Sequence, residues 1–156
     1  MKVLMVCLGN ICRSPMADGL LRKKVAEEGL EVIVDSAGTS DYHIGGAPDS
    51  RMRETARSMG YPIDELRARQ FVQEDYDEFD LIYAMDSSNY NNMIRLARNE
   101  NDKAKVRMIL NESNPNSNQE VPDPYYGGEQ GFVNVFNLLD EATDVIIKNI
   151  KSDDKR

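Results

Sequence analysis

The chain has 156 residues and a formal net charge of −8, a length that fits one domain with a core of its own. The negative balance argues against nucleic acid or an anionic membrane as partners, because both repel an acidic protein. Two cysteines are too few for a disulfide framework, and the apolar run after Met1 is too short for a signal peptide or a membrane span, so we expect a cytoplasmic protein.

Short apolar runs alternate with helix-like segments along the chain. Residues 2–7 predict a buried strand, and residues 14–28 have the period of an amphipathic helix. Further strands are expected over residues 31–36, 81–85 and 105–109, a short strand or edge segment over 69–72, and helices over 48–59, 87–98 and 132–150. This alternation predicts an α/β fold: a single domain, a four-stranded parallel sheet, and helices on both faces.

Three polar segments lie outside this pattern. Residues 111–120 are expected to form an exposed loop. The charge run at 74–80 indicates a solvated face rather than a metal site, since it holds no histidine or cysteine. Residues 151–156 are expected to be a disordered tail, which leaves a domain over residues 1–150.

The turn after the first strand carries the most informative residues. Cys7 and Arg13 bracket the segment Cys7-Leu8-Gly9-Asn10-Ile11-Cys12-Arg13-Ser14, which leads from the strand into the first helix. A helix N-terminus presents unpaired N–H groups and a partial positive charge. Together with Arg13, these N–H groups should favour the thiolate of Cys7 and form a binding site for a dianion such as phosphate. The guanidinium of Arg13 can donate two parallel hydrogen bonds to that dianion. The segment therefore predicts a phosphate-binding loop with a nucleophile and no metal.

The spacing of Cys7 and Arg13 is weak evidence alone, because a buried cysteine and a surface arginine often lie six positions apart by chance. Gly9, Asn10 and Ser14 strengthen it: Ser14 can donate to the thiolate and also suits a helix N-cap. The nucleotide-binding pattern Gly-x4-Gly-Lys-[Ser/Thr] is not found, which argues against a nucleoside triphosphate site.

Asp123 lies between Pro122 and Pro124. In isolation this is most simply a rigid turn with an Asx-type hydrogen bond. Next to a nucleophilic cysteine, the alternative is a general acid that the two prolines hold over the site. We favour the general acid, with Tyr125 and Tyr126 forming a wall of a substrate cleft.

Three further residues each have two interpretations. Tyr42 and His43 lie in a turn-rich stretch, and although a lone histidine is most often structural, we interpret the pair as a second rim of the cleft. Cys12 is either a small buried apolar residue or a thiol that forms a disulfide with Cys7 and protects it from over-oxidation.

Five segments together resemble the low-molecular-weight protein tyrosine phosphatases. They occur in that family's order and span most of the chain: Cys-Leu-Gly-Asn-Ile-Cys-Arg-Ser-Pro at 7–15, Asp-Ser-Ala-Gly-Thr at 35–39, Ala-Arg-Gln at 68–70, Ala-Met-Asp at 84–86 and Asp-Pro-Tyr-Tyr at 123–126.

The resemblance implies a role for each matching residue. Cys7 would become a phosphocysteine, Arg13 would bind the phosphoryl group, and Asp123 would protonate the leaving phenolate and then activate water. Among the supporting residues, Asn10 would hold the loop in a strained shape with help from Ser36, and Asp86 would orient Arg13. Cys12 would form a reversible disulfide with Cys7. One departure is Leu66, where the family often has a histidine, and this puts one supporting hydrogen bond in doubt.

These observations predict a metal-independent protein tyrosine phosphatase, without a cofactor, that acts as a monomer on phosphotyrosine-containing proteins. A thiol-linked arsenate reductase is similar in fold and loop, but it would need further cysteines downstream, and none follows Cys12. A non-catalytic phosphotyrosine-binding module would keep the loop and lose the nucleophile or the acid, whereas Cys7, Arg13 and Asp123 are all present.

Overall fold

Four parallel strands, β1 (Lys2–Cys7), β2 (Ile33–Gly38), β3 (Leu81–Ala84) and β4 (Val106–Met108), form one sheet in the order β2-β1-β3-β4. The structure is a computed structural model and describes residues 1–154, without the side chains of Tyr126, Asp153 and Asp154. The helical elements are α1 (Arg13–Glu27), α2 (Ser50–Ser58), α3 (Asp75–Glu78), α4 (Ser87–Ile94), α5 (Glu100–Lys105), α6 (Leu110–Ser113), the 3₁₀ helix η1 (Pro124–Tyr126) and α7 (Gly128–Asp154).

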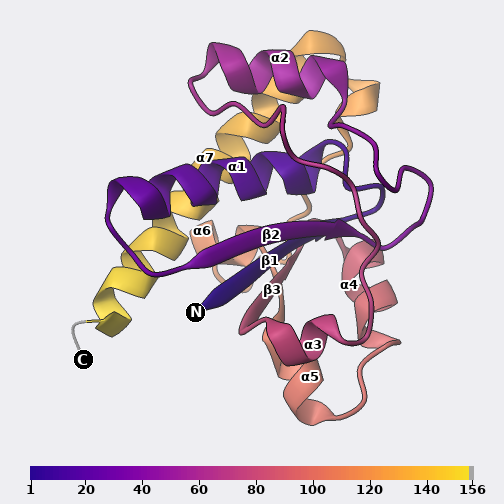
Figure 1. The fold of residues 1–156 in the computed structure, drawn as a ribbon, viewed down its shortest axis with the longest axis vertical. Helices are drawn as coiled ribbons and strands as arrows, with labels where there is room; N and C mark the ends of the chain where they lie inside the picture. Colours follow the sequence, from indigo (N-terminus) through magenta and orange to yellow (C-terminus); the bar gives the residue numbers. More distant parts are fainter. Residues whose placement is uncertain (155–156) are drawn as a thin grey trace.

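Helices cover both faces of the sheet, which confirms the predicted α/β fold. Figure 1 shows α1, α2 and α7 on one side and α3, α4 and α5 on the other. The side chains of β1 alternate between two cores, as the pleat of a strand requires. Val3, Met5 and Cys7 belong to the core under α1 and α7, while Leu4 and Val6 belong to the core on the opposite face. Cys7 therefore lies at the end of a strand whose side chains pack into a core on each face of the sheet.

The first helix begins one residue earlier than predicted. Arg13 is already helical, and Cys12 takes the N-cap position without a side-chain hydrogen bond. Ser14 is therefore not the N-cap, and its hydroxyl is free for other partners.

Two predicted elements in the middle of the chain need correction, and a third, expected as a short strand or edge segment, is an edge segment. The helix expected over 87–98 ends at Ile94, and α5 starts anew after Asn99, whose side chain caps it by accepting from the N–H of Asp102 at 2.9 Å. The segment 69–72 contributes only one bridge, between Gly38 and Gln70. The loop expected over 111–120 begins inside the short helix α6.

The charge run at 74–80 is not wholly a solvated face. It contains α3, in which Asp75 is buried and accepts 3.1 Å hydrogen bonds from both terminal nitrogens of Arg69. Asp75 also accepts from the N–H of Val72 at 2.9 Å, so it fixes the turn that leads into the helix. A buried carboxylate is stable here because its lone pairs are satisfied by a guanidinium and a backbone donor.

The last helix is longer than predicted at both ends, running from Gly128 to Asp154. The first four residues of the expected tail thus continue the helix, and Lys151 pairs with Glu28 at 2.9 Å. Residues 155 and 156 lie outside the described part of the chain, and the boundary at residue 150 stays a prediction. Within residues 1–154, the helices are too short or too polar to cross a membrane.

Candidate active site

The loop between β1 and α1 passes very close to the end of β2. Cys7 pairs with Gly38 in the sheet, and a Cβ on Gly38 would lie 2.7 Å from the carbonyl oxygen of Leu8. Only glycine fits this approach. Asn10 has a φ of 56°, in the left-handed region that asparagine tolerates better than most residues. The backbone of residues 8–12 therefore makes a tight turn over the sheet edge, as predicted from the sequence.

The sulfur of Cys7 is buried inside this turn and receives polar contacts. The N–H of Asn10 donates to Sγ at 3.3 Å, and the hydroxyl of Ser14 lies 3.0 Å from it. The same hydroxyl lies 2.8 Å from Oδ1 of Asn10. A hydroxyl has one proton, so Ser14 can donate to the sulfur or to Asn10 at one time. When Cys7 is a thiolate, the charged acceptor is the stronger one.

Arg13 extends from the first turn of α1 toward β3, and its side chain is buried. Its Nη1 donates to Oδ2 of Asp86 at 2.8 Å and to the carbonyl oxygen of Val121 at 3.0 Å. Burial opposes the charged guanidinium, but the neighbouring Cys7, Asp86 and Asp123 outweigh it, so the pKa of Arg13 lies above its usual value. Among the hydrogen bonds of the described residues, Nε and Nη2 have no partner, which leaves one edge of the guanidinium to bind an oxyanion.

Asp123 is the residue before η1, and it accepts from the N–H of Tyr125 at 3.0 Å. The Asx-type turn that is the simpler interpretation of this sequence is therefore present. It does not compete with the functional interpretation, because Asp123 also lines the cleft above Cys7 and Arg13.

The segment that carries Asp123 docks on the start of α2. The hydroxyl of Tyr125 donates to Oδ2 of Asp49 at 3.2 Å. The guanidinium of Arg51 stacks between two rings, 4.8 Å from the centroids of both Tyr125 and Phe132. Asp49 in turn donates its N–H to the carbonyl oxygen of Ile11 at 2.7 Å. The sequence indicates that a helix starts near Asp49. It does not indicate that Asp49 connects the segment that carries Asp123 to the phosphate-binding loop.

The cleft has a volume of about 220 Å³. Tyr42, His43 and Tyr125 line it, while the side chain of Tyr126 lies outside the described residues. The cleft is lined by Cys7, Leu8, Gly9, Ile11, Cys12, Arg13, Tyr42, His43, Asp123, Pro124 and Tyr125.

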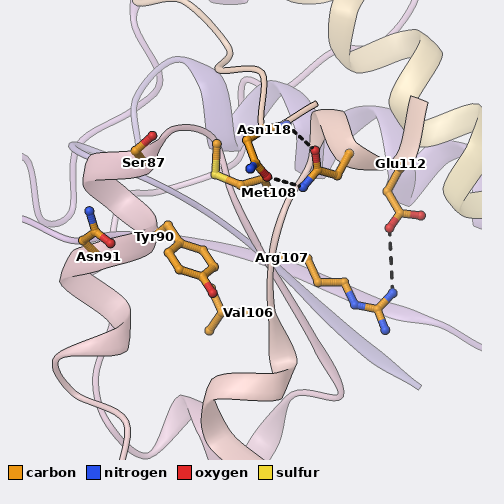
Figure 2. Close-up of a pocket in the computed structure, with 9 residues that line it drawn as sticks. Ser87, Tyr90, Asn91, Val106, Arg107, Met108, Glu112 and Asn118 are labelled. Carbon is orange, nitrogen blue, oxygen red and sulfur yellow. Dashed lines mark hydrogen bonds and ion pairs between the residues drawn. The ribbon is translucent and has the colours of Figure 1, made fainter. Parts of the chain in front are cut away.

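A larger cavity of about 520 Å³ lies elsewhere, between α4, β4, α6 and Asn118. Figure 2 shows the ring of Tyr90 on one side of it and Asn118 on another, and Asn118 is hydrogen-bonded to Asn111. Its one cation, Arg107, lies 3.8 Å from Glu112, and its lining contains no cysteine or histidine. Size alone does not mark the reaction site, since this cavity has neither a nucleophile nor an unpaired phosphate clamp.

Ser36 lies in β2 and is buried, and the hydrogen bonds of the described residues include none between its hydroxyl and Asn10. Its support of Asn10 stays a prediction. Nδ2 of Asn10 is buried without a partner among those residues. Leu66, at the position where a histidine was expected, is half-buried against the apolar core.

Cys12 is buried at the N-cap of α1. Burial, and then the charges of Asp49 and Cys7, raise the pKa of its thiol to about 12. It therefore stays protonated at neutral pH, unlike a nucleophile or a metal ligand. Its role as a partner for Cys7 in a disulfide stays a prediction.

Asp18 should give the protein a pH-dependent stability. The carboxyl is fully buried, and burial raises its pKa to about 6 despite its pairing with Arg22. The pKa is about 3.9 in an unfolded chain, so the folded state holds the extra proton between these values. The contribution of Asp18 to the free energy of unfolding is therefore fully present below about pH 4, and about 2–3 kcal/mol of it is lost as the pH rises to about 6.

Urea unfolding at several pH values would measure this effect in the parent and in Asp18→Asn. The variant should lose the decline, because its amide does not ionise. The exposed Asp41, changed to Asn, is the matched control and should keep the decline. Equal slopes for the parent and Asp18→Asn would show that Asp18 does not titrate in this range.

Comparison with known proteins places the chain among relatives. The family model described as low molecular weight phosphotyrosine protein phosphatase matches residues 2–156. A putative low molecular weight protein-tyrosine-phosphatase of Synechocystis is 48% identical, covering 91% of each chain. A crystal structure of a protein tyrosine phosphatase from Entamoeba histolytica superposes with a TM-score of 0.91 at 41% identity, covering 99% of both chains. A Drosophila arginine phosphatase gives 0.89 at 30% identity, covering 98% and 99%.

These similarities extend beyond the loop at Cys7. They include the segment around Asp123 and the first and last elements of the chain, so the relatives share the whole domain and not one motif alone. The chain belongs to the low molecular weight phosphotyrosine protein phosphatase family.

Proposed function

We propose that this protein hydrolyses phosphotyrosine through a phosphocysteine on Cys7, with Arg13 as the phosphate clamp and Asp123 as the acid and base. The observation that carries the proposal is one cleft in which the sulfur of Cys7, the unpaired edge of Arg13 and the carboxyl of Asp123 meet. This combination supplies a nucleophile, a charge stabiliser and a proton donor without a metal.

In the first step the thiolate of Cys7 attacks phosphorus. An S–P bond forms, the bond between phosphorus and the phenolic oxygen breaks, and the proton of Asp123 goes to that oxygen. Arg13 and the N–H groups of the loop stabilise the charge that gathers on the equatorial oxygens. Ser14 donates to the sulfur before the attack.

In the second step water attacks phosphorus and gives its proton to the carboxylate of Asp123. The S–P electron pair returns to Cys7, and inorganic phosphate leaves. One residue can serve in both steps, because the leaving phenol and the attacking water occupy the same side of the phosphoryl group.

The walls of the cleft favour an aromatic substrate. Leu8, Ile11 and Tyr125 offer apolar surface against which a phenyl ring can pack, with the phosphate at the bottom near Cys7. We expect phosphotyrosine-containing proteins as substrates, and a cytoplasmic monomer. Rates on phosphotyrosine and phosphoarginine, measured with a chelator present, test the substrate class, since a relative of similar fold is named an arginine phosphatase. Faster hydrolysis of phosphoarginine, or none of either, would overturn the proposal.

Asp123→Asn should slow the first step most for poor leaving groups. The amide has no proton to give to the phenolate, so phenol release should fall more for an ordinary phenol than for a strongly acidic one. Pre-steady-state phenol release with two such substrates measures this difference. Asp144→Asn, on the exposed face of α7, is the control and should match the parent. Equal slowing of phenol release for both substrates would remove Asp123 from the general-acid role.

A further inference from the structure

Asn89 lies in the first turn of α4, and its side chain is almost fully buried behind the phosphate-binding loop. The orientation of its amide is set by its neighbours. The nitrogen donates to Oδ1 of Asp86 at 3.1 Å, and the oxygen accepts from the backbone N–H of Leu8 at 3.2 Å. The opposite orientation would bring oxygen against oxygen and N–H against N–H, which is unfavourable in a buried site.

These contacts form a continuous series of hydrogen bonds from the phosphate-binding loop to Arg13. The N–H of Leu8 binds Asn89, Asn89 binds one oxygen of Asp86, and the other oxygen of Asp86 accepts from Arg13 at 2.8 Å. The backbone N–H of Asn89 also donates to Oδ1 of Asp86 at 2.8 Å. Asp86 therefore receives two hydrogen bonds from one residue, and these fix the direction in which its second oxygen points.

Leu8, Arg13, Asp86 and Asn89 also line a cavity of about 250 Å³, so this group of side chains is not packed on every side. Hydrogen bonds therefore help to fix the direction in which each side chain points. Loss of the Asn89 side-chain amide would leave the N–H of Leu8 unpaired and would remove one of the two hydrogen bonds that fix Oδ1 of Asp86, so Asp86 would hold Arg13 less firmly.

We propose that Asn89 is a positioning residue that sets the guanidinium of Arg13, through Asp86, and the entrance of the phosphate-binding loop, through Leu8. Asn89 does not touch the substrate. It acts on phosphate binding and on the rate through the alignment of groups that do. The link to turnover rests on the proposed function, whereas the link to phosphate binding does not.

Asn89→Leu tests the proposal, since leucine has the same number and branching of side-chain heavy atoms and makes neither hydrogen bond. Asn91→Leu is the matched control, with the same change on the exposed side of the same helix. The Kd of inorganic phosphate should rise in Asn89→Leu, and kcat/KM on aryl phosphates should fall about 10–100-fold, the scale of a small misalignment. The fall should be equal for good and poor leaving groups, because Asp123 is untouched. Asn91→Leu should match the parent in both measurements.

Asn89→Asp is the second variant and remains informative if the leucine variant does not fold. Its carboxylate still accepts from Leu8 but, when ionised, repels Asp86. Its phosphate affinity should therefore approach that of the parent at low pH and decline more steeply than the parent's as both carboxyls ionise.

The outcomes separate the proposals. The positioning role would be overturned if folded Asn89→Leu kept a phosphate affinity and a kcat/KM within about twofold of the parent. It would also be overturned if the phosphate affinities of the parent and of Asn89→Asp changed in parallel with pH. If the parent binds phosphate and hydrolyses no aryl phosphate, the proposed function fails, and the phosphate measurement still decides the role of Asn89.

Discussion

Cys7→Ser should abolish steady-state hydrolysis while the protein stays folded and still binds inorganic phosphate. A serine hydroxyl is hardly ionised at neutral pH, and Cys7 is the group that would form the covalent bond to phosphorus. We expect a loss of at least about 10⁴-fold in kcat, the order that removal of a covalent nucleophile costs.

Phosphate binding is the control for this variant, because the loop N–H groups and Arg13 remain in place. A phosphate Kd close to that of the parent would show that the site is intact. Appreciable turnover by the pure variant would remove Cys7 from the nucleophile role and point to a different first step.

Arg13→Lys should be nearly as damaging as Arg13→Ala. The arginine uses Nη1 to contact Asp86 and the carbonyl oxygen of Val121, and presents its other edge to the phosphate. A lysine ammonium has one nitrogen and no second edge, so it would contact either Asp86 or the phosphoryl oxygens. Loss of this contact in the transition state should cost about 3–4 kcal/mol, a factor of a few hundred in kcat/KM.

The matched control is Arg95→Lys, an exposed arginine just after α4, which should leave kcat/KM unchanged. Near-normal turnover by Arg13→Lys would mean that a point charge is sufficient and that the two-edged geometry of the guanidinium is unimportant.

The sequence indicates the site well where its parts are local. Cys7 and Arg13 lie on one short turn, so their spacing and the flanking strand and helix are enough to predict a phosphate-binding loop. The α/β fold can be predicted equally well from the sequence, because alternating apolar runs and helical periods predict a parallel sheet with helices on both faces.

The contacts of Asn89 and Arg51, which form only through the tertiary structure, were not predicted. Asn89 and Arg51 follow ordinary helix starts, and nothing local tells that one reaches Leu8 and the other stacks on Tyr125. For Asn89 a signal did exist: it lies three residues after the capping Asp86, a spacing that brings two side chains together. For Arg51 there was none, since its ring partners come from a segment more than seventy residues away.

The errors in element boundaries have a similar cause. Residues 87–98 have a helical pattern throughout, but α4 ends at Ile94 and Asn99 caps a new helix, because the chain must turn to enter β4 at the sheet edge. Ser36 was expected to support Asn10, but Oδ1 of Asn10 lies 2.8 Å from the hydroxyl of Ser14 and, among the described residues, no hydrogen bond joins Asn10 to Ser36. Local propensity does not report which polar partner a buried hydroxyl will have.

Direct detection of phosphocysteine tests the central claim. An aryl phosphate would be turned over by the parent, the reaction quenched within one turnover, and the peptides mapped by mass spectrometry under conditions that preserve S–P bonds. We predict one phosphoryl group on the peptide with Cys7, no label in Cys7→Ser, and release of the label as inorganic phosphate if the quench is delayed. A phosphoryl group on another residue, or phenol release that precedes phosphate with no labelled protein, would contradict the mechanism.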